Sequence, residues 1–181
     1  MQRVRLATVW LGGCSGCHMS FLDLDEWLID LVSMVDIVFT PIADVKRYPE
    51  DVDVALVEGA IANHEHLEMI HRVRNNTKLL IAFGDCAVTG NVTALRNPLG
   101  PAINVLQSVY VDGVDLQGQI PQQAGIVPQL LDRVVPVHAV VAVDHYLPGC
   151  PPPAARIRAV IEELLGGGPA ELDARDRLKF G

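Results

Sequence analysis

Three apolar runs each lead into a loop that carries cysteine, and this repeated arrangement limits what the chain can fold into. Residues 4–11 precede Cys14-Ser15-Gly16-Cys17, residues 79–83 precede Cys86, and residues 139–143 precede Cys150. Runs of this length and composition are typical of buried parallel strands. In an open α/β sheet, ligands bind outside the carboxyl ends of the strands. We therefore expect the loops to converge at one edge of a sheet and to bring four thiols together.

Strand-like and helical segments alternate along much of the chain. We expect strands at 4–11, 36–40, 52–57, 77–83 and 137–143, and helices at about 19–35, 63–75 and 154–165. This alternation predicts right-handed crossovers and a mostly parallel sheet. The predicted fold is therefore α/β, a flavodoxin-like arrangement of three layers with the cysteine loops at the carboxyl ends of the strands.

The length of 181 residues suits one domain with a substantial core, which we place at residues 1–165. Residues 97–129 break the pattern, and Asp112 and Asp115 are the only charges in the glycine- and glutamine-rich part of this stretch. Long irregular connections in compact domains are usually functional or disordered. Because half of the residues are apolar and only 20% are charged, we interpret this insertion as a surface that packs against another chain. Residues 166–181 form a charged C-terminal tail.

Composition argues against several classes of protein. A net charge of −8 without a cluster of Lys and Arg disfavours nucleic-acid binding. The longest nearly apolar run, 134–143, falls short of the roughly 20 residues of a membrane-spanning helix. The N-terminus enters a strand-like run without a leader sequence, so we expect a cytoplasmic protein. Cytoplasmic thiols stay reduced, which favours metal ligands or redox groups over disulfides.

Four explanations of the cysteines compete. A structural zinc site normally uses two close ligand pairs, whereas only Cys14 and Cys17 are close in sequence. A thioredoxin-like dithiol would leave Cys86 and Cys150 without a role. Inert buried cysteines are common, but these four lie at strand ends near Gly or Pro. A [4Fe–4S] cluster takes four thiolates, and glycine-rich loops allow backbone N–H groups to approach its sulfurs. The spacing favours the cluster and leaves zinc as an alternative.

Four motifs in order resemble the small subunit of nickel–iron hydrogenases. They are Cys14-Ser15-Gly16-Cys17-His18, Val57-Glu58-Gly59-Ala60, Gly84-Asp85-Cys86-Ala87 and Leu147-Pro148-Gly149-Cys150-Pro151-Pro152. The resemblance covers about residues 6–165. It implies that Cys14, Cys17, Cys86 and Cys150 hold the proximal [4Fe–4S] cluster, next to a nickel–iron centre on a separate large subunit. This chain would itself hold no nickel.

The resemblance also implies a place in a hetero-oligomer. Longer members of the family carry further cysteines for two more clusters, whereas all four cysteines here are already assigned. The pattern is most similar to the short cytoplasmic subunits of NAD-reducing, bidirectional hydrogenases, which pass electrons to diaphorase subunits with flavin and iron–sulfur clusters. An alternative is the related subunit of a quinone-reductase-like complex, whose first motif has adjacent cysteines. A zinc-stapled interaction module is a third.

Other residues near the motifs are weaker candidates. Glu58 accepts N–H bonds from the first cysteine loop or helps a proton leave, or else it is an ordinary exposed carboxylate at a strand end. We expect His18 to face solvent, and we treat Asp85 and His145 in the same way. His64, His66 and His71 share one predicted helix but do not suit a common metal face, so we expect them to be solvated. FMN is weighed because of the fold and is not favoured, since cysteines occupy the loop that would cradle its phosphate.

Overall fold

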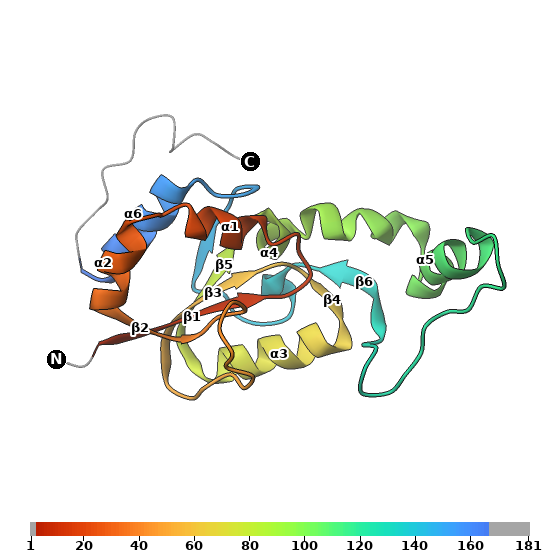
Figure 1. The fold of residues 1–181 in the computed structure, drawn as a ribbon, viewed down its shortest axis with the longest axis horizontal. Helices are drawn as coiled ribbons and strands as arrows, with labels where there is room; N and C mark the ends of the chain where they lie inside the picture. The colour runs from red at the N-terminus through yellow and green to blue at the C-terminus, as the bar shows by residue number, and fades with distance from the viewer. Residues whose placement is uncertain (1–2, 167–181) are drawn as a thin grey trace.

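A computed structural model describes residues 3–166 of the chain. Its centre is a five-stranded sheet in the order β2-β1-β3-β5-β7, and every neighbouring pair in it is parallel (Figure 1). The strands are β1 (Val4–Trp10), β2 (Val35–Phe39), β3 (Val52–Glu58), β5 (Thr77–Phe83) and β7 (His145–Leu147). The α/β class, the mostly parallel sheet and the flavodoxin-like order are therefore confirmed.

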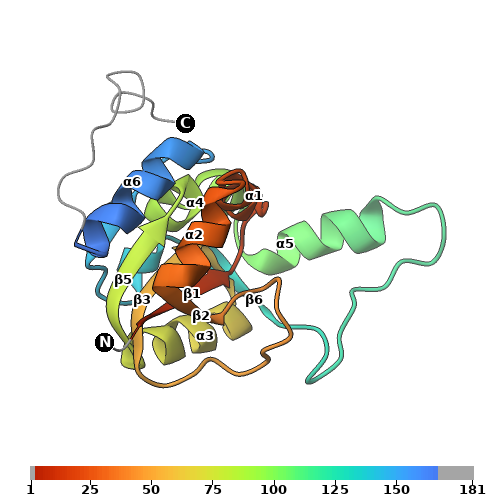
Figure 2. The ribbon, with the colours of Figure 1, turned by 60° about the vertical axis from the view of Figure 1, so that its left-hand side comes forward.

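Helices cover both faces of the sheet, which makes three layers (Figures 1 and 2). On one face lie α1 (Gly16–Leu22), α2 (Trp27–Met34) and α6 (Ala154–Leu164), and on the other lies α3 (His64–Asn75). Side chains of β3 alternate between the two, because Leu56 packs with the first group and Val57 with the second. A strand buried on both faces needs apolar side chains on both, which explains the unbroken apolar run at residues 54–57 of β3.

The helix expected at 19–35 is two helices, and this expectation was wrong. Residues 23–26 turn between α1 and α2, and Asp25 has a left-handed backbone with φ of 51°. The turn reorients the chain so that Leu24 and Trp27 are both buried in the core beside the sheet. An apolar periodicity that continues across the turn conceals it from sequence inspection.

The strand expected at 137–143 is also wrong. Residues Val137–Ala139 form a 3₁₀ helix (η3) after Pro136, and Val137 is fully buried in the core on the α3 side. Pairing with β5 starts only at Asp144, whose N–H donates to the Leu80 carbonyl (2.9 Å) and whose carboxylate accepts from the Leu80 N–H (2.7 Å). The apolar character of this segment therefore reflects burial in a non-strand conformation.

A second, small sheet lies beside the first. It consists of β4 (Ile61–Asn63) and β6 (Leu130–Val135), which pair antiparallel. Arg96 donates to the carbonyl groups of Ala62 (3.1 Å) and Leu131 (2.6 Å), one on each strand. This sheet fixes both ends of the segment that departs from the body of the molecule.

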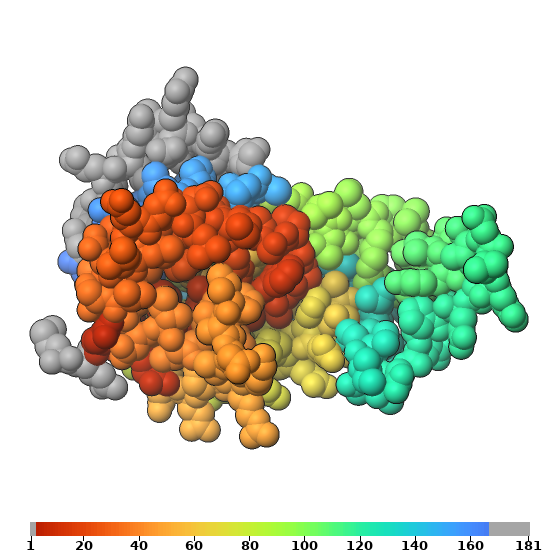
Figure 3. Space-filling view, viewed as in Figure 1, coloured from red at the N-terminus to blue at the C-terminus, as the bar shows by residue number. Residues whose placement is uncertain are grey.

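That segment forms an arm (residues 97–129) that extends from the body, as Figures 1, 2 and 3 show. It was expected to be irregular, yet its first half is helical. The 3₁₀ helix η1 (Asn91–Leu99) leads into α5 (Ala102–Gln107) and a π-helical turn, η2 (Ser108–Asp112). An apolar cavity of about 680 Å³ lies between α5, η2 and residues 120–130.

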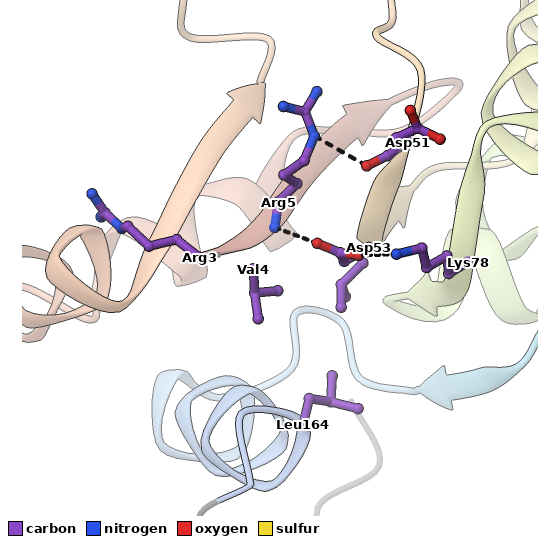
Figure 4. A pocket seen from close by; sticks show the side chains of 8 residues that line it. Arg3, Val4, Arg5, Asp51, Asp53, Lys78 and Leu164 are labelled. Atoms are coloured by element: carbon purple, nitrogen blue, oxygen red, sulfur yellow. Dashed lines mark hydrogen bonds and ion pairs between the residues drawn. The ribbon is translucent and has the colours of Figure 1, made fainter. Parts of the chain in front are cut away.

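The amino-terminal edge of the sheet is charged and lies opposite the cysteine loops. Figure 4 shows a pocket there in which the Asp53 carboxylate accepts from the Arg5 N–H (2.8 Å) and pairs with Lys78 (2.7 Å). Helix α6 ends beside this pocket, as predicted for residues 154–165. The expected tail at 166–181 lies outside the described residues except for Gly166. Within residues 3–166, every helix is too short or too polar to cross a membrane.

Candidate metal centre

The four cysteines lie in the three loops that leave the carboxyl ends of β1, β5 and β7. Cys14 precedes α1, and Cys17 lies in the first turn of that helix. Cys86 is in the first turn of the short helix α4 (Asp85–Thr89), and Cys150 follows β7. Cys17 and Cys86 are buried, Cys14 and Cys150 are exposed, and all four are free thiols. The site is therefore open to solvent on one side and closed by the core on the other.

The thiols and Glu58 influence one another's ionisation. Burial raises the pKa of Cys17 far above its usual value, and the charges of Glu58, Cys86, Cys14 and Cys150 raise it further. Burial also raises the pKa of Cys86, with added contributions from Cys14 and Cys150. Within residues 3–166, no three Cys, His, Asp or Glu side chains are close enough to share a single metal ion. The thiols therefore gather at one sheet edge as separate donors.

Backbone bonds hold the second and third cysteine loops together. The Gly84 N–H donates to the Leu147 carbonyl (2.8 Å), and the Asp85 N–H donates to the Gly149 carbonyl (2.9 Å). The Asp85 carboxylate accepts from the Gly149 N–H (2.7 Å). Asp85 was expected to be solvated, which is wrong, because this bond fixes the loop that carries Cys150.

Gly84 also makes room for sulfur. Its φ is +82°, and a Cβ atom there would lie 2.1 Å from the Sγ atom of Cys17. Glycine is the residue that adopts this backbone without strain. The Cys17 sulfur thus lies directly against the backbone of the second cysteine loop.

Glu58 and His18 form a buried pair beneath the first cysteine loop. Glu58 is only 1% exposed, and its carboxylate accepts from the His18 N–H (3.0 Å) and contacts the His18 ring nitrogen Nδ1. The predicted N–H bond from this loop is confirmed, and the interpretation of Glu58 as an exposed carboxylate is wrong. The ring of His18 packs edge-on against Phe83, at 6.2 Å between centroids.

His18 is therefore not the solvent-facing residue that we expected. Because α1 starts at Gly16, the third residue of the helix turns inward, and His18 is 4% exposed. Its other ring nitrogen, Nε2, is buried and has no hydrogen-bond partner among the residues that the structure describes. Buried polar atoms are normally satisfied, so an unsatisfied one beside Cys17 marks a place where a group from outside the chain is expected.

The four other histidines considered in the sequence differ in their exposure. His145, His64 and His71 are exposed, as predicted. His66 is half-buried, contrary to expectation, because its Nδ1 atom accepts from the Ala62 N–H (3.3 Å). Burial lowers its pKa. None of these side chains joins the cysteines in a metal-binding group within the described part of the chain.

Two polar residues near the cysteines were missed by sequence inspection. The Nδ2 atom of Asn91 donates to the Sγ atom of Cys150 (3.2 Å), and the Thr93 hydroxyl donates to the Gly12 carbonyl (2.8 Å). The signal that could have found them is their position, because they follow Cys86 by only a few residues. No periodicity or motif predicts that a side chain after Cys86 reaches Cys150.

Comparison with known proteins identifies the family. The family model of the NADH ubiquinone oxidoreductase 20 kDa subunit matches residues 14–164. The delta subunit of NAD-reducing hydrogenase HoxS from Cupriavidus necator is 35% identical over 176 residues, which cover 94% of this chain and 82% of that subunit. One component of the F420-non-reducing hydrogenase from Methanothermobacter marburgensis is 37% identical over 176 residues, with 94% and 56% covered. The chain thus spans little more than half the length of several curated relatives.

Solved structures agree with this assignment. A chain in the crystal structure of NAD⁺-reducing [NiFe]-hydrogenase in the H₂-reduced state superposes with a TM-score of 0.92 at 36% identity, covering 99% of this chain and all of that one. An [NiFeSe]-hydrogenase chain from Dm. baculatum, at a TM-score of 0.59 and 16% identity, shares the fold. The chain therefore belongs to the family of the NADH ubiquinone oxidoreductase 20 kDa subunit, which it shares with the delta subunit of NAD-reducing hydrogenase HoxS.

Proposed function

We propose that this chain is the electron-transfer subunit of an NAD-reducing nickel–iron hydrogenase and that it binds one [4Fe–4S] cluster through Cys14, Cys17, Cys86 and Cys150. The observation that carries the proposal is that the three loops with the four free thiols meet at one edge of the sheet: the Cys17 sulfur lies against Gly84, and backbone bonds join the Cys86 loop to the Cys150 loop. When bound, such a cluster stores and releases single electrons. The protein controls this chemistry through hydrogen bonds, nearby charge and burial.

The residues present fit such a cluster. Each thiolate of a [4Fe–4S] cluster binds a different iron, so the sulfurs need not surround one point as closely as the ligands of zinc, which lie about 2.3 Å from the metal. The backbone at Gly84 has no side chain, so a cluster could approach it closely. On the buried side, the Nε2 atom of His18 is a polar atom without a hydrogen-bond partner in the described part of the chain.

The chain's own residues would divide the work at this site. Cys17 and Cys86 anchor the buried side, and the Glu58–His18 pair fixes the loop between β1 and α1 from below. Glu58 lies at the end of β3 with its charge close to the Cys17 thiol. It can hold the first loop in place and can accept a proton that leaves the buried site.

The exposed side of the site would face the large subunit, which carries the nickel–iron centre. Cys14 and Cys150 are exposed, and about half of the side chains of Trp10, at the end of β1, and Met19, in α1, is uncovered as well. A redox centre bound there needs a partner to exclude water. Diaphorase subunits with flavin would then receive the electrons, in a cytoplasmic complex where thiols stay reduced. We assign no FMN to this chain, since the loop after β1 carries Cys14 and Cys17.

We assign the arm to partner contact as well. Several of its large apolar side chains are more than half uncovered: Leu99, Ile103, Leu116 and Ile126. Exposed apolar surface of this extent marks interaction sites. The arm continues directly from η1, whose first residue bonds Cys150. A subunit that covers the cysteine edge would therefore also reach the arm.

Anaerobic co-expression of the chain with its large subunit tests the proposal. We expect copurification, a brown protein, and an EPR signal of a reduced [4Fe–4S] cluster that appears under dihydrogen. Colourless protein with stoichiometric zinc would support the zinc-stapled module instead. A cluster that only quinone-reductase partners retain and reduce would support the quinone-reductase alternative.

A further inference from the structure

The chain turns sharply after Cys86 and returns toward Cys150. Helix α4 ends at Gly90, whose φ is +89° and whose N–H donates to the Cys86 carbonyl (3.0 Å). Asn91 follows with a φ of +35°, so two consecutive residues have positive φ. Asn tolerates this region better than most residues, but a non-glycine residue there is uncommon. Such a backbone persists when its surroundings hold it in place.

The surroundings of Asn91 do hold it. Its N–H donates to the Thr89 hydroxyl (3.3 Å), and that hydroxyl donates to the Asp85 carbonyl (2.9 Å). Its side-chain Nδ2 atom donates to the Sγ atom of Cys150 (3.2 Å). Asn91 is therefore fixed to the helix that carries one cysteine and bonds the sulfur of another.

Thr93 secures the same segment from the other side. Its hydroxyl donates to the carbonyl of Gly12 (2.8 Å), in the loop that carries the first two cysteines. Hydrogen bonds from Thr93 also oppose the effect of burial on the pKa of Cys86. The segment from Asn91 to Thr93 thus contacts all three cysteine loops, and Asn91 supplies the side-chain donor to a sulfur that is otherwise exposed.

We propose that Asn91 is a positioning residue that sets the reduction potential of the cluster through its hydrogen bond to the Cys150 sulfur. This inference rests on the proposed function. Reduction adds negative charge, part of which lies on the ligand sulfurs, and an N–H donor stabilises that added charge. The donor therefore raises the potential and favours acceptance of an electron. A role in folding alone would not change the potential of a cluster that still assembles.

Two substitutions separate these roles. Asn91→Gly keeps the positive φ, which glycine adopts freely, and removes the donor. Asn91→Asp keeps the shape, cannot donate, and places a negative charge beside the sulfur. Asn104→Ala is the matched control, because the Nδ2 atom of Asn104 donates to a carbonyl, that of Leu99 (3.1 Å), and not to a thiol.

The measurement is an EPR-monitored redox titration of the anaerobic complex, with iron counted in each sample. At a fixed applied potential, we expect the ratio of reduced to oxidised cluster to fall roughly three- to tenfold in Asn91→Gly, further in Asn91→Asp, and not at all in Asn104→Ala. Equal potentials in all samples would overturn the inference. Loss of iron from both Asn91 variants would overturn it too, since the residue would then only support the fold. A wild-type complex without any cluster would refute the proposed function itself, which is a separate result.

Discussion

Gly84→Ala is the most sensitive single change to the geometry of the cysteine edge. The added Cβ atom would lie 2.1 Å from the Sγ atom of Cys17, and the backbone would have to keep a φ of +82°. With a ψ of 163° as well, Gly84 lies in a region that is essentially limited to glycine, and a side chain there costs about 1–3 kcal/mol. Overpacking a buried site costs about 1–3 kcal/mol more. Since Cys17 is 7% exposed and packed in the core, its sulfur cannot move aside freely.

Gly125→Ala is the control for the backbone cost. Gly125 has a similar φ of +75°, and a Cβ atom there would meet nothing within 4 Å. Urea unfolding of the reduced, iron-free chain should therefore show a loss of about 1–2 kcal/mol for Gly125→Ala and about 2–6 kcal/mol for Gly84→Ala. Reconstituted Gly84→Ala should also hold less iron, because the displaced sulfur no longer occupies its position. Equal unfolding free energies with equal iron content would refute this account of the contact between the loops.

Three further outcomes follow from the charges of the structure. Glu58→Gln keeps an oxygen acceptor for the His18 N–H but loses the charge. It should lower the unfolding free energy by about 1–3 kcal/mol in urea titrations and alter the EPR signal of the cluster. An unchanged signal with unchanged stability would contradict the role of Glu58. Burial raises the pKa of Cys17 above the unfolded value of 9.0, so the iron-free chain should be most stable below pH 9. Above pH 9 its unfolding free energy should fall by up to about 1.4 kcal/mol per pH unit. Cys17→Ala should reduce this slope in unfolding curves at about pH 8 to 10. The Arg5 N–H and Lys78 lower the pKa of Asp53, so its stabilising contribution is present above the unfolded value of 3.8 and is lost as the pH falls through the folded value. Acid unfolding followed by circular dichroism should therefore be less steep in Asp53→Asn. An identical acid transition would count against this role of Asp53.

The pattern of the sequence predicted most of the central sheet because its strands are buried on both faces. Such strands are apolar over most of their length, and β1, β3 and β5 are found where those runs lie. The same criterion failed at residues 137–143, since burial also makes a non-strand segment apolar. What decides the position of β7 is a pair of backbone and side-chain bonds between Asp144 and Leu80, which are far apart in sequence.

The cysteine site was predictable as a set and not in its supporting contacts. The four thiols follow strands of one sheet, so the topology alone brings them to one edge. Whether His18 faces inward depends on the residue at which α1 starts, because each residue turns a helix by about 100°. The bond from Asn91 to Cys150 joins two loops that only the tertiary fold brings together. Local pattern carries no information on such a contact.

The most direct test of the central claim is a count of iron and acid-labile sulfide in the complex purified without oxygen. The account predicts about four iron atoms and four sulfide ions per copy of this chain from its own site, with an EPR signal that dihydrogen induces, and loss of that signal in Cys86→Ala. Stoichiometric zinc with no sulfide, or a cluster signal that survives in Cys86→Ala, would contradict it.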